Sequence, residues 1–573
     1  MSCQVLIIPY RRPTHNTYTP IVVSNSITTL FYKGGVFLFN PNFNPYPSHR
    51  NVVYGNNGIV ATSQSLAAQA GLRILQQGGN AIDAAIATAA CLTVVEPTSN
   101  GIGGDAFALV WTKGKLHGLN ASGPAPKNIS IEKVMALGHE KMPQFGWLPV
   151  TVPGVPAAWA ALSKRFGKLP FGEVLNPAIE YSKRGFPVSP TVAYYWDFAF
   201  GKNSQNPDKE TFTEWLKTFA PHGRAPRVGE IWKSGDHSRT LEEIAKTGSE
   251  SFYRGELAEK IAEASQKAGG FLTAQDLSDY EPEWVEPIKV NYRGYDVWEL
   301  PPNGQGIIAL SALNILKEFD FASKDTAETI HKQIEAIKLA FSAASKAISD
   351  PGHMNPSHVP FLLSETFADR ERERIGEKAI EPVPGSLPKG GTVYLCTADG
   401  EGNMVSFIQS NYWGFGSGIV VPGTGISMQN RGYEFSLDPA HPNALMGGKK
   451  PYHTIIPGFL SKDGEAVGPF GVMGGYMQPQ GHVQLLMNTI DFKLNPQMAL
   501  DAPRFQWTEG KTVEVEYNFP KHVAEELAAK GHDIRIALNA GGFGRGQIIW
   551  RDPLNGVLAG GCDSRSDSAV AAF

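Results

Sequence analysis

Apolar and polar residues alternate most regularly between residues 389 and 410, and this pattern predicts a β-hairpin. Over residues 393–397, valine, leucine and threonine alternate with tyrosine and cysteine, which is the two-residue period of a half-buried strand. Residues 399–403 contain two glycines among polar residues and are typical of a turn. The β-rich run at residues 404–409 then supplies the second strand of the hairpin.

The position of the turn determines which residues face each other across this hairpin. If the turn is centred on Glu401, Ala398 pairs with Met404 and Thr392 pairs with Ser410. Directly opposed residues in an antiparallel pair have Cβ atoms about 4.5–5.5 Å apart. The sequence therefore predicts that two hydroxyl groups meet at the open end of the hairpin.

The rest of the chain mixes helical and strand patterns. Residues 58–62 are typical of a short strand, and apolar residues recur at helical spacing along residues 66–74. Residues 81–94 carry alanines around most of the helical circumference, which is typical of a buried, closely packed helix. Residues 150–350 are predicted to be mostly helical, residues 466–473 to form a buried strand, and residues 425–429 to form a further strand. These patterns predict an α+β fold.

Composition narrows the function classes. With 573 residues, 42% hydrophobic and 18% charged, the chain is long enough for two domains or one large intertwined domain. A net charge of −4 without a long basic run argues against a nucleic-acid partner. No stretch approaches the roughly 18 uninterrupted apolar residues of a membrane helix. Because residues 3–10 lack the charged start of a secretory signal, we expect a cytoplasmic protein without a membrane partner.

The cysteine spacing and two segments without a regular hydrophobic pattern give further predictions. The four cysteines share no metal-binding or CxxC spacing, so we expect neither a metal nor another cofactor. Residues 1–50 show no consistent period and are predicted to be a poorly ordered leader. Residues 365–387 are charged and then proline-rich, which favours an exposed, mobile segment ahead of Thr392.

Thr392 follows two glycines, and this placement has chemical significance. If the chain is cut between Gly391 and Thr392, the threonine carries a nucleophile and a general base in one residue. Its free α-amine, with a pKa of about 7.7–8.0, is able to take the hydroxyl proton near neutral pH. The local pattern leaves a second interpretation open, namely an ordinary surface hairpin with a buried threonine.

Two glycine-rich stretches are candidates for binding negative charge. Residues 101–104 resemble a phosphate loop, but they lack its Lys-Ser/Thr pair and follow a helix, so phosphate binding is disfavoured. Gly474 and Gly475 follow a buried strand, where adjacent backbone N–H groups are able to point at one oxyanion. A plain turn remains the alternative for this pair.

From about residue 55 to its end, the chain resembles the γ-glutamyltransferase family. The resemblance rests on ordered motifs, at residues 78–85, 95–97, 101–104, 389–392, 501–505 and 563–567. It implies a four-layer αββα sandwich of the N-terminal-nucleophile hydrolase type. It also implies a large subunit, residues 51–391, intertwined with a small subunit, residues 392–573. In that family the threonine after the cut is the nucleophile, Ser410 would position it, and the Gly474–Gly475 pair supplies the oxyanion donors.

The resemblance weakens at the positions where the family binds its substrate. The arginine that binds the glutamyl α-carboxylate falls on Ser122, and the asparagine near the nucleophile falls on Tyr412. A hydroxyl does not replace a bidentate guanidinium. The remaining family positions, two serines, a glutamine and an aspartate, fall on His453, Thr454, Arg431 and Glu434. This pattern resembles the acylase-like branch, which includes proteins similar to cephalosporin acylases.

The motifs favour a self-processing N-terminal threonine amidohydrolase or acyltransferase. Its expected substrate is a small γ-glutamyl amide such as glutathione, with water or an amine or peptide as acceptor. One alternative is an acylase that cleaves another dicarboxylate monoamide, such as a glutaryl amide. Another is an uncleaved, non-catalytic relative that binds a small molecule or a partner. Serine-triad and metal hydrolases are poor rivals, because the chain has no G-x-S-x-G and no H-E-x-x-H.

Overall fold

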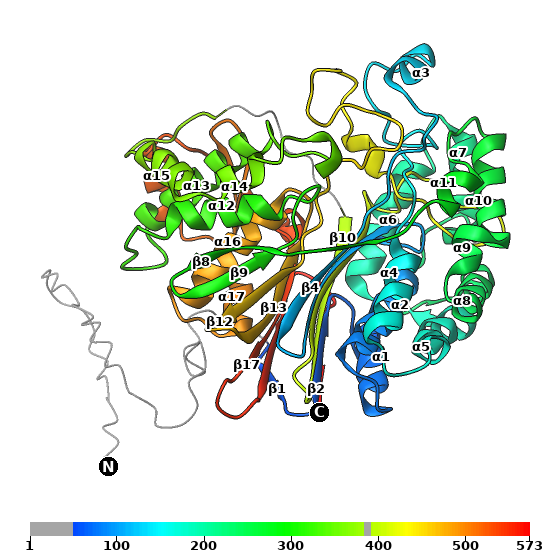
Figure 1. Ribbon diagram of the computed structural model, residues 1–573, viewed down its shortest axis with the longest axis horizontal. Coiled ribbons are helices and arrows are strands. Elements are labelled where there is room, and N and C mark those ends of the chain that lie inside the picture. Colours follow the sequence, from blue (N-terminus) through cyan, green and yellow to red (C-terminus); the bar gives the residue numbers. More distant parts are fainter. Residues whose placement is uncertain (1–49, 383–390) are drawn as a thin grey trace, which may run out of the picture. The chain divides into compact units, whose positions relative to one another are not determined.

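The computed structural model describes residues 50–382 and 391–573. The predicted leader at residues 1–50 lies outside the described residues, apart from Arg50, and so do residues 383–387 of the segment predicted to be mobile. Two seven-stranded sheets form the centre of the described chain (Figure 1). The first sheet has the order β19 (Ala569–Ala572), β2 (Gly58–Thr62), β10 (Gly391–Asp399), β11 (Met404–Tyr412), β3 (Asp105–Thr112), β4 (Lys115–Ala121) and β7 (Glu283–Val285).

Neighbouring strands of the second sheet are antiparallel throughout. Its order is β1 (Val53–Gly55), β18 (Leu558–Cys562), β17 (Arg545–Arg551), β13 (Glu465–Met473), β12 (Gly458–Lys462), β9 (Tyr295–Glu299) and β8 (Ile288–Tyr292). Two smaller sheets consist of β14 (Phe505–Glu509), β15 (Thr512–Glu516) and β16 (Asp533–Ala537), and of β5 (Phe186–Pro187) and β6 (Ile231–Trp232). Both large sheets take strands from before and after Gly391, so the two parts of the chain are interwoven.

The helices of the described chain form two groups. Figure 1 shows two groups of helices on opposite sides of the strands. The first group is α1 (Ser65–Gln76), α2 (Ala81–Val95), α3 (Ile131–Ala136), α4 (Val155–Phe166), α5 (Phe171–Arg184), α6 (Pro190–Asn203), α7 (Lys209–Phe219), α8 (Gly235–Thr247), α9 (Glu250–Arg254), α10 (Glu256–Lys267) and α11 (Ala274–Ser278). Of these, α1, α2 and α4 contact the first sheet directly.

The second group lies against the second sheet through α12, α16 and α17. It comprises α12 (Gly306–Leu316), α13 (Ala327–Ala344), α14 (His358–Leu362), α15 (Glu365–Glu373), α16 (Met477–Ile490), α17 (Pro496–Asp501) and α18 (Lys521–Ala529). Three short 3₁₀ helices are η1 (Pro351–His353), η2 (Arg431–Glu434) and η3 (Ala540–Gly542). Within residues 50–382 and 391–573, no helix combines the length and apolar character needed to cross a membrane.

The predicted hairpin is confirmed, but its burial is not as predicted. β10 and β11 are buried along both faces rather than half-buried. Val393 and Leu395 pack into the core on the helix side, whereas Tyr394 and Cys396 pack into a core between the two sheets. The alternation therefore marks two different apolar cores, because both faces of the central strand are covered.

Two further predictions have opposite outcomes. The alanine-rich helix is confirmed as α2, and Asn80 begins it with a capping box to Asp83. The stretch at residues 425–429, which was expected to be a strand, forms only isolated bridges from Ser427 and Met428. Gly425 has a φ of 71°, so its backbone is not extended as a strand requires.

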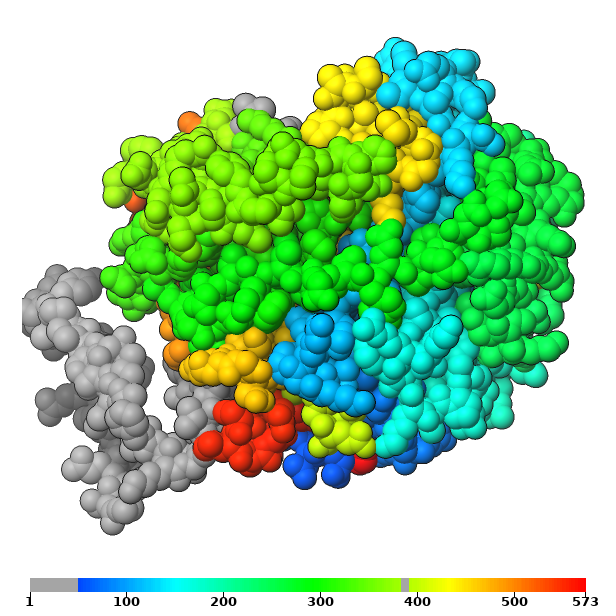
Figure 2. Space-filling view, viewed as in Figure 1, coloured from blue at the N-terminus to red at the C-terminus, as the bar shows by residue number. Residues whose placement is uncertain are grey.

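The parts of the chain on either side of Gly391 also share the surface. In Figure 2, green and cyan segments that precede Gly391 lie beside yellow, orange and red segments that follow it. A cut at Gly391 would therefore leave two chains in extensive contact. Residues 365–373, part of the segment expected to be mobile, form the ordered helix α15.

Candidate active site

The hydroxyls of Thr392 and Ser410 meet at the start of β10. The ladder pairs Ala398 with Met404, as predicted, and stays in that register as far as Val393. Before Val393 the register shifts, so that Gly391 pairs with Tyr412. This irregularity falls on Thr392, whose Oγ1 lies 3.0 Å from Ser410 Oγ. The close approach predicted from the turn position is confirmed.

Both hydroxyls also reach the carbonyl of the peptide bond that precedes Thr392. Thr392 Oγ1 and Ser410 Oγ each donate a hydrogen bond of 2.8 Å to Gly391 O. The backbone N–H of Tyr412 donates to Ser410 Oγ at 2.8 Å, which fixes the position of this hydroxyl. Hydrogen bonds to a carbonyl oxygen favour attack on its carbon, because negative charge develops on the oxygen. The peptide bond predicted to be cut is thus polarised next to a hydroxyl nucleophile.

Ser410→Ala is expected to lower the amide hydrolysis rate by roughly 10–100-fold, which is less than a typical loss of proton transfer. The methyl side chain keeps the strand but removes the hydroxyl that lies 3.0 Å from Thr392 Oγ1. Single-turnover kinetics on cleaved enzyme would measure the effect. Ser406→Ala is the matched control, because Ser406 lies on the same strand and bonds Tyr394 instead. Equal loss in both variants would contradict a positioning role for Ser410.

Gly474 and Gly475 follow β13 in conformations that favour glycine, with φ of 143° and 61°. Their carbonyls are occupied: Gly474 O accepts from Met477 N, and Gly475 O accepts from Gln305 Nε2 at 2.9 Å. Among the described residues, no acceptor is found for either backbone N–H group. Two free amides after a buried strand fit an oxyanion site, and their action on a Thr392-bound substrate stays a prediction.

Arg431 and Glu434, two of the predicted substrate-binding residues, lie on η2. Arg431 is fully buried, with Nη1 donating to Thr454 Oγ1 at 2.7 Å and the guanidinium 4.2 Å above the Tyr412 ring. Its Nε and Nη2 atoms have no partner among the described residues. Two hydroxyls hold Glu434, one from Tyr412 and one from Tyr476 at 2.8 Å. Burial raises the pKa of the Glu434 carboxyl, although both tyrosines and Arg431 oppose that shift.

Ser122 and His453 belong to the same polar cluster. Ser122 Oγ donates to Asn120 Oδ1 at 2.7 Å and accepts from Asn303 Nδ2 at 3.2 Å. The backbone carbonyl of Asn303 accepts from His453 N at 2.9 Å. All these side chains are buried, so Ser122 already has hydrogen-bond partners within the protein. The structure thus brings the predicted substrate-binding residues into one connected network.

Sequence reasoning missed several members of this network. Asp105 pairs with Ser410 across β3 and β11, and its Oδ2 lies 3.0 Å from His453 Nε2. Gln305 donates to Gly475 O and accepts from the hydroxyl of Tyr452 at 3.1 Å. Asp105 directly follows the motif at residues 101–104, and Gln305 lies in a motif at residues 301–306 to which sequence reasoning assigned no catalytic role. Both motifs were visible, but their spatial neighbours were not.

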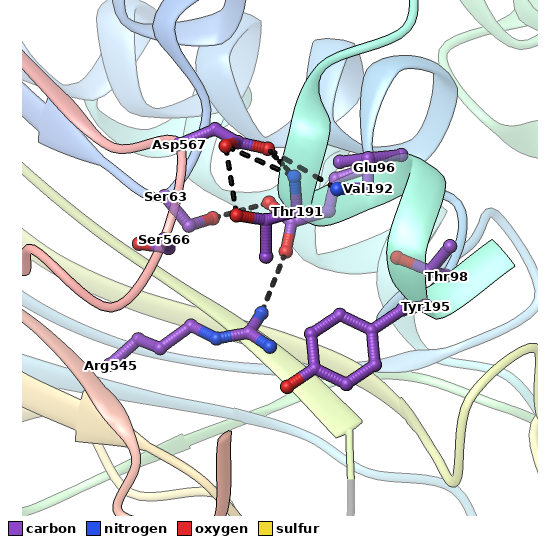
Figure 3. A pocket seen from close by; sticks show the side chains of 9 residues that line it. All are labelled: Ser63, Glu96, Thr98, Thr191, Val192, Tyr195, Arg545, Ser566 and Asp567. Carbon is purple, nitrogen blue, oxygen red and sulfur yellow. Dashed lines mark hydrogen bonds and ion pairs between the residues drawn. The ribbon is translucent and has the colours of Figure 1, made fainter. Parts of the chain in front are cut away.

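Two buried carboxyls make the stability of the folded chain depend on pH. Burial raises the pKa of Asp105 to about 7, although Arg431 opposes this shift. Burial also raises the pKa of Glu96 to about 7, with Arg545 in opposition. Figure 3 shows the Glu96 carboxylate between Ser63 and Arg545, whose Nη1 lies 3.6 Å from Glu96 Oε1. This second cluster borders the cleavage region, since a Cβ on Gly391 would lie 3.7 Å from the Cα atom of Ser99.

We expect the contribution of these two carboxyls to the thermal unfolding midpoint to fall as the pH rises from 6 to 8. In the unfolded chain these carboxyls ionise near their ordinary pKa values of 3.8 and 4.5, so the stabilising contribution is complete below those values. It is lost as the pH rises through about 7, when the folded chain must bury two charges. Asp105→Asn and Glu96→Gln should each flatten this slope, whereas the exposed control Asp197→Asn should not. An unchanged slope in both buried variants would contradict the assignment.

Comparisons with known proteins found a matching family model and similar relatives. A family model described as Gamma-glutamyltranspeptidase matches residues 67–573. The Glutathione hydrolase-like YwrD proenzyme of Bacillus subtilis is 36% identical over 533 residues, which cover 90% of this chain and 99% of the relative. The Oxamate amidohydrolase proenzyme of Klebsiella pneumoniae is 33% identical, with 90% and 98% covered. The crystal structure of a cephalosporin acylase from Bacillus halodurans is 62% identical, with a TM-score of 0.89, and covers 93% of this chain and 99% of its own.

Proposed function

The chain belongs to the gamma-glutamyltranspeptidase family, and on that premise we propose that it cuts itself between Gly391 and Thr392 and then acts on amides through Thr392. The observation that carries this proposal is the group formed by Thr392 Oγ1, Ser410 Oγ and Gly391 O, with separations of 2.8 and 3.0 Å. The cut separates residues 1–391, which contain the large subunit at residues 51–391, from the small subunit, residues 392–573, and the two subunits stay intertwined. The proposal includes a four-layer αββα sandwich, which the helix–sheet contacts support.

In the proposed self-cleavage, Thr392 Oγ1 attacks the carbonyl carbon of Gly391. The C–N bond to Thr392 breaks, an ester to Oγ1 forms, and the nitrogen takes the hydroxyl proton. Water then hydrolyses the ester, which leaves a carboxylate on Gly391 and a free amine on Thr392. Ser410 polarises the carbonyl throughout, since its hydroxyl donates to Gly391 O.

The freed amine then serves as the general base of the mature enzyme. It takes the Oγ1 proton while Oγ1 attacks the substrate carbonyl, and it returns the proton to the leaving amine. The free N–H groups of Gly474 and Gly475 receive the developing oxyanion. Water, or an acceptor amine, resolves the acyl-enzyme and restores Thr392. No metal or other cofactor takes part in this scheme.

The substrate class is an amide whose acyl group carries a carboxylate, with γ-glutamyl amides as first choice. Arg431 offers unpaired donors for the carboxylate, and Glu434 offers acceptor oxygens for the α-ammonium. The second candidate is a glutaryl-type monoamide. Its acyl group carries the carboxylate but no α-ammonium, so it would use Arg431 without Glu434.

A substrate screen combined with a denaturing gel tests this proposal. We expect two fragments, corresponding to residues 1–391 and 392–573, and faster hydrolysis of γ-glutamyl anilide than of glutaryl or aromatic acyl anilides. Preference for the glutaryl anilide would select the second candidate. A single full-length band without hydrolysis of any anilide would instead support a non-catalytic binding protein.

A further inference from the structure

Three buried side chains that the proposed chemistry does not use converge on one point. His331 and Glu335 lie on α13, and His532 immediately precedes β16. One donor atom from each of the three lies within 4.8 Å of the other two. His331 and Glu335 are four residues apart, so they project from the same face of the helix. The cluster therefore joins a helix from before Gly391 to a loop from after it.

The surroundings of His331 determine which of its nitrogens carries the proton. Its Nε2 lies 2.8 Å from the carbonyl oxygen of Gly376, which accepts hydrogen bonds but cannot donate them. A neutral His331 therefore carries its proton on Nε2 and presents a lone pair at Nδ1. That lone pair faces His532 Nε2 at 2.8 Å. A histidine whose outer N–H donates to a backbone carbonyl is oriented as metal-bound histidines are.

Glu335 supplies the third donor from a fixed position. Its Oε2 accepts from the Ile380 N–H at 3.1 Å, and its Oε1 lies 3.7 Å from His532 Nε2. Lys338 Nζ lies 2.9 Å from the same Oε1, but it also donates to the carbonyl of Ile380 at 3.1 Å. Lys338 thus has a second acceptor if a cation takes its place beside Glu335.

We propose that His331, Glu335 and His532 bind a divalent transition-metal ion, with Zn²⁺ as the best-suited example. Two imidazoles and one carboxylate form a ligand set that zinc accepts, at about 2.0–2.2 Å from each donor. Tetrahedral coordination at those lengths separates the donors by roughly 3.3 Å. Two of the observed separations, 2.8 and 3.7 Å, lie on either side of that value and the third is no more than 4.8 Å, so the side chains must move to complete the site.

The site would act as a structural clamp. His331 and Glu335 fall in the large subunit and His532 in the small one, a consequence that rests on the proposed cut. The same helix places Phe341 beside Tyr476, with ring centroids 6.3 Å apart, and Tyr476 holds Glu434. His331 lies ten residues, or about 15 Å, before Phe341 along this helix, so the proposed metal site is remote from the residues around Glu434. We therefore expect the metal to stabilise the protein and to affect turnover little.

Cobalt titration of the full-length protein, after treatment with a chelator, tests the proposal. One equivalent of Co²⁺ should give visible absorption bands of a four-coordinate ion, Zn²⁺ should abolish them, and either metal should raise the unfolding midpoint. Glu335→Gln and His532→Gln should each weaken Co²⁺ binding by at least ~10-fold, since even partners outside the ligand shell have effects of that size. The exposed His522→Gln on α18 is the matched control and should bind like the parent.

The outcomes separate a metal site from a hydrogen-bonded histidine pair. If the parent protein binds no stoichiometric Co²⁺, or if Glu335→Gln binds it as tightly as His522→Gln, the proposal is wrong. The titration of the parent decides this even where His532→Gln does not fold. The uncut Thr392→Ala chain should bind the metal equally, so failure of the metal site and failure of the proposed cleavage remain distinguishable.

Discussion

Thr392→Ala is expected to yield a single uncut chain without amide hydrolysis. The substitution removes the Oγ1 atom that lies 2.8 Å from Gly391 O and 3.0 Å from Ser410 Oγ. Both the acyl shift and the later attack on substrate need that atom, so the loss should be complete rather than partial. A denaturing gel of freshly purified protein, followed over days, would measure cleavage. An anilide assay on the same samples would measure hydrolysis.

Two companion variants make this result specific. Thr392→Ser keeps a hydroxyl and should still cut, more slowly, because the missing methyl leaves the side chain freer to rotate. Thr397→Ala lies on the same strand, where its hydroxyl bonds the carbonyl of Ala81, and should cut normally. If Thr392→Ala gives the normal fragments, another protease makes the cut and the self-processing proposal is wrong.

The sequence predicted the hairpin well because its signals are local. A glycine-containing turn of fixed length determines the register as far as Val393, and the hydroxyls of Thr392 and Ser410 still meet beyond the register shift that follows. The sequence did not predict that both faces of β10 are buried. Alternation looks the same whether the second face meets solvent or, as for Tyr394 and Cys396, a second sheet. Burial of that kind depends on strands more than 60 residues away, such as β12 and β13.

The substrate-binding region was predicted only in part, for the same physical reason. Family positions identified Arg431 and Glu434, but not that two tyrosines orient Glu434 and that Tyr412 stacks on Arg431. Asp105, which lies opposite Ser410, was not singled out although it neighbours a recognised motif. These contacts join segments that only the folded chain brings together, and no spacing in the sequence encodes them.

Arg431→Ala is expected to lower kcat/KM by roughly 30–150-fold, or about 2–3 kcal/mol, for acyl groups that carry a carboxylate. Thr454 and Tyr412 hold the guanidinium. Its Nε and Nη2 atoms have no partner among the described residues, so they are available to a ligand. A buried, pre-oriented donor pair is worth more than a surface charge, because water screens it little. Arg431→Lys keeps the charge but loses the planar fork, so it should recover only part of the activity. Arg227→Ala, at an exposed arginine, should leave kinetics unchanged.

Glu434→Gln distinguishes recognition of the ammonium from support of the fold. Glutamine keeps the size of the side chain and an oxygen for the tyrosine hydroxyls, but it loses the negative charge that attracts an α-ammonium. A γ-glutamyl group carries that ammonium and a glutaryl group does not. We therefore expect kcat/KM for γ-glutamyl anilide to fall about 10-fold or more, while the value for glutaryl anilide stays within about 2-fold. If Arg431→Ala and Glu434→Gln reduce activity equally on every substrate, uncharged acyl anilides included, the pair supports the fold and does not select the acyl group.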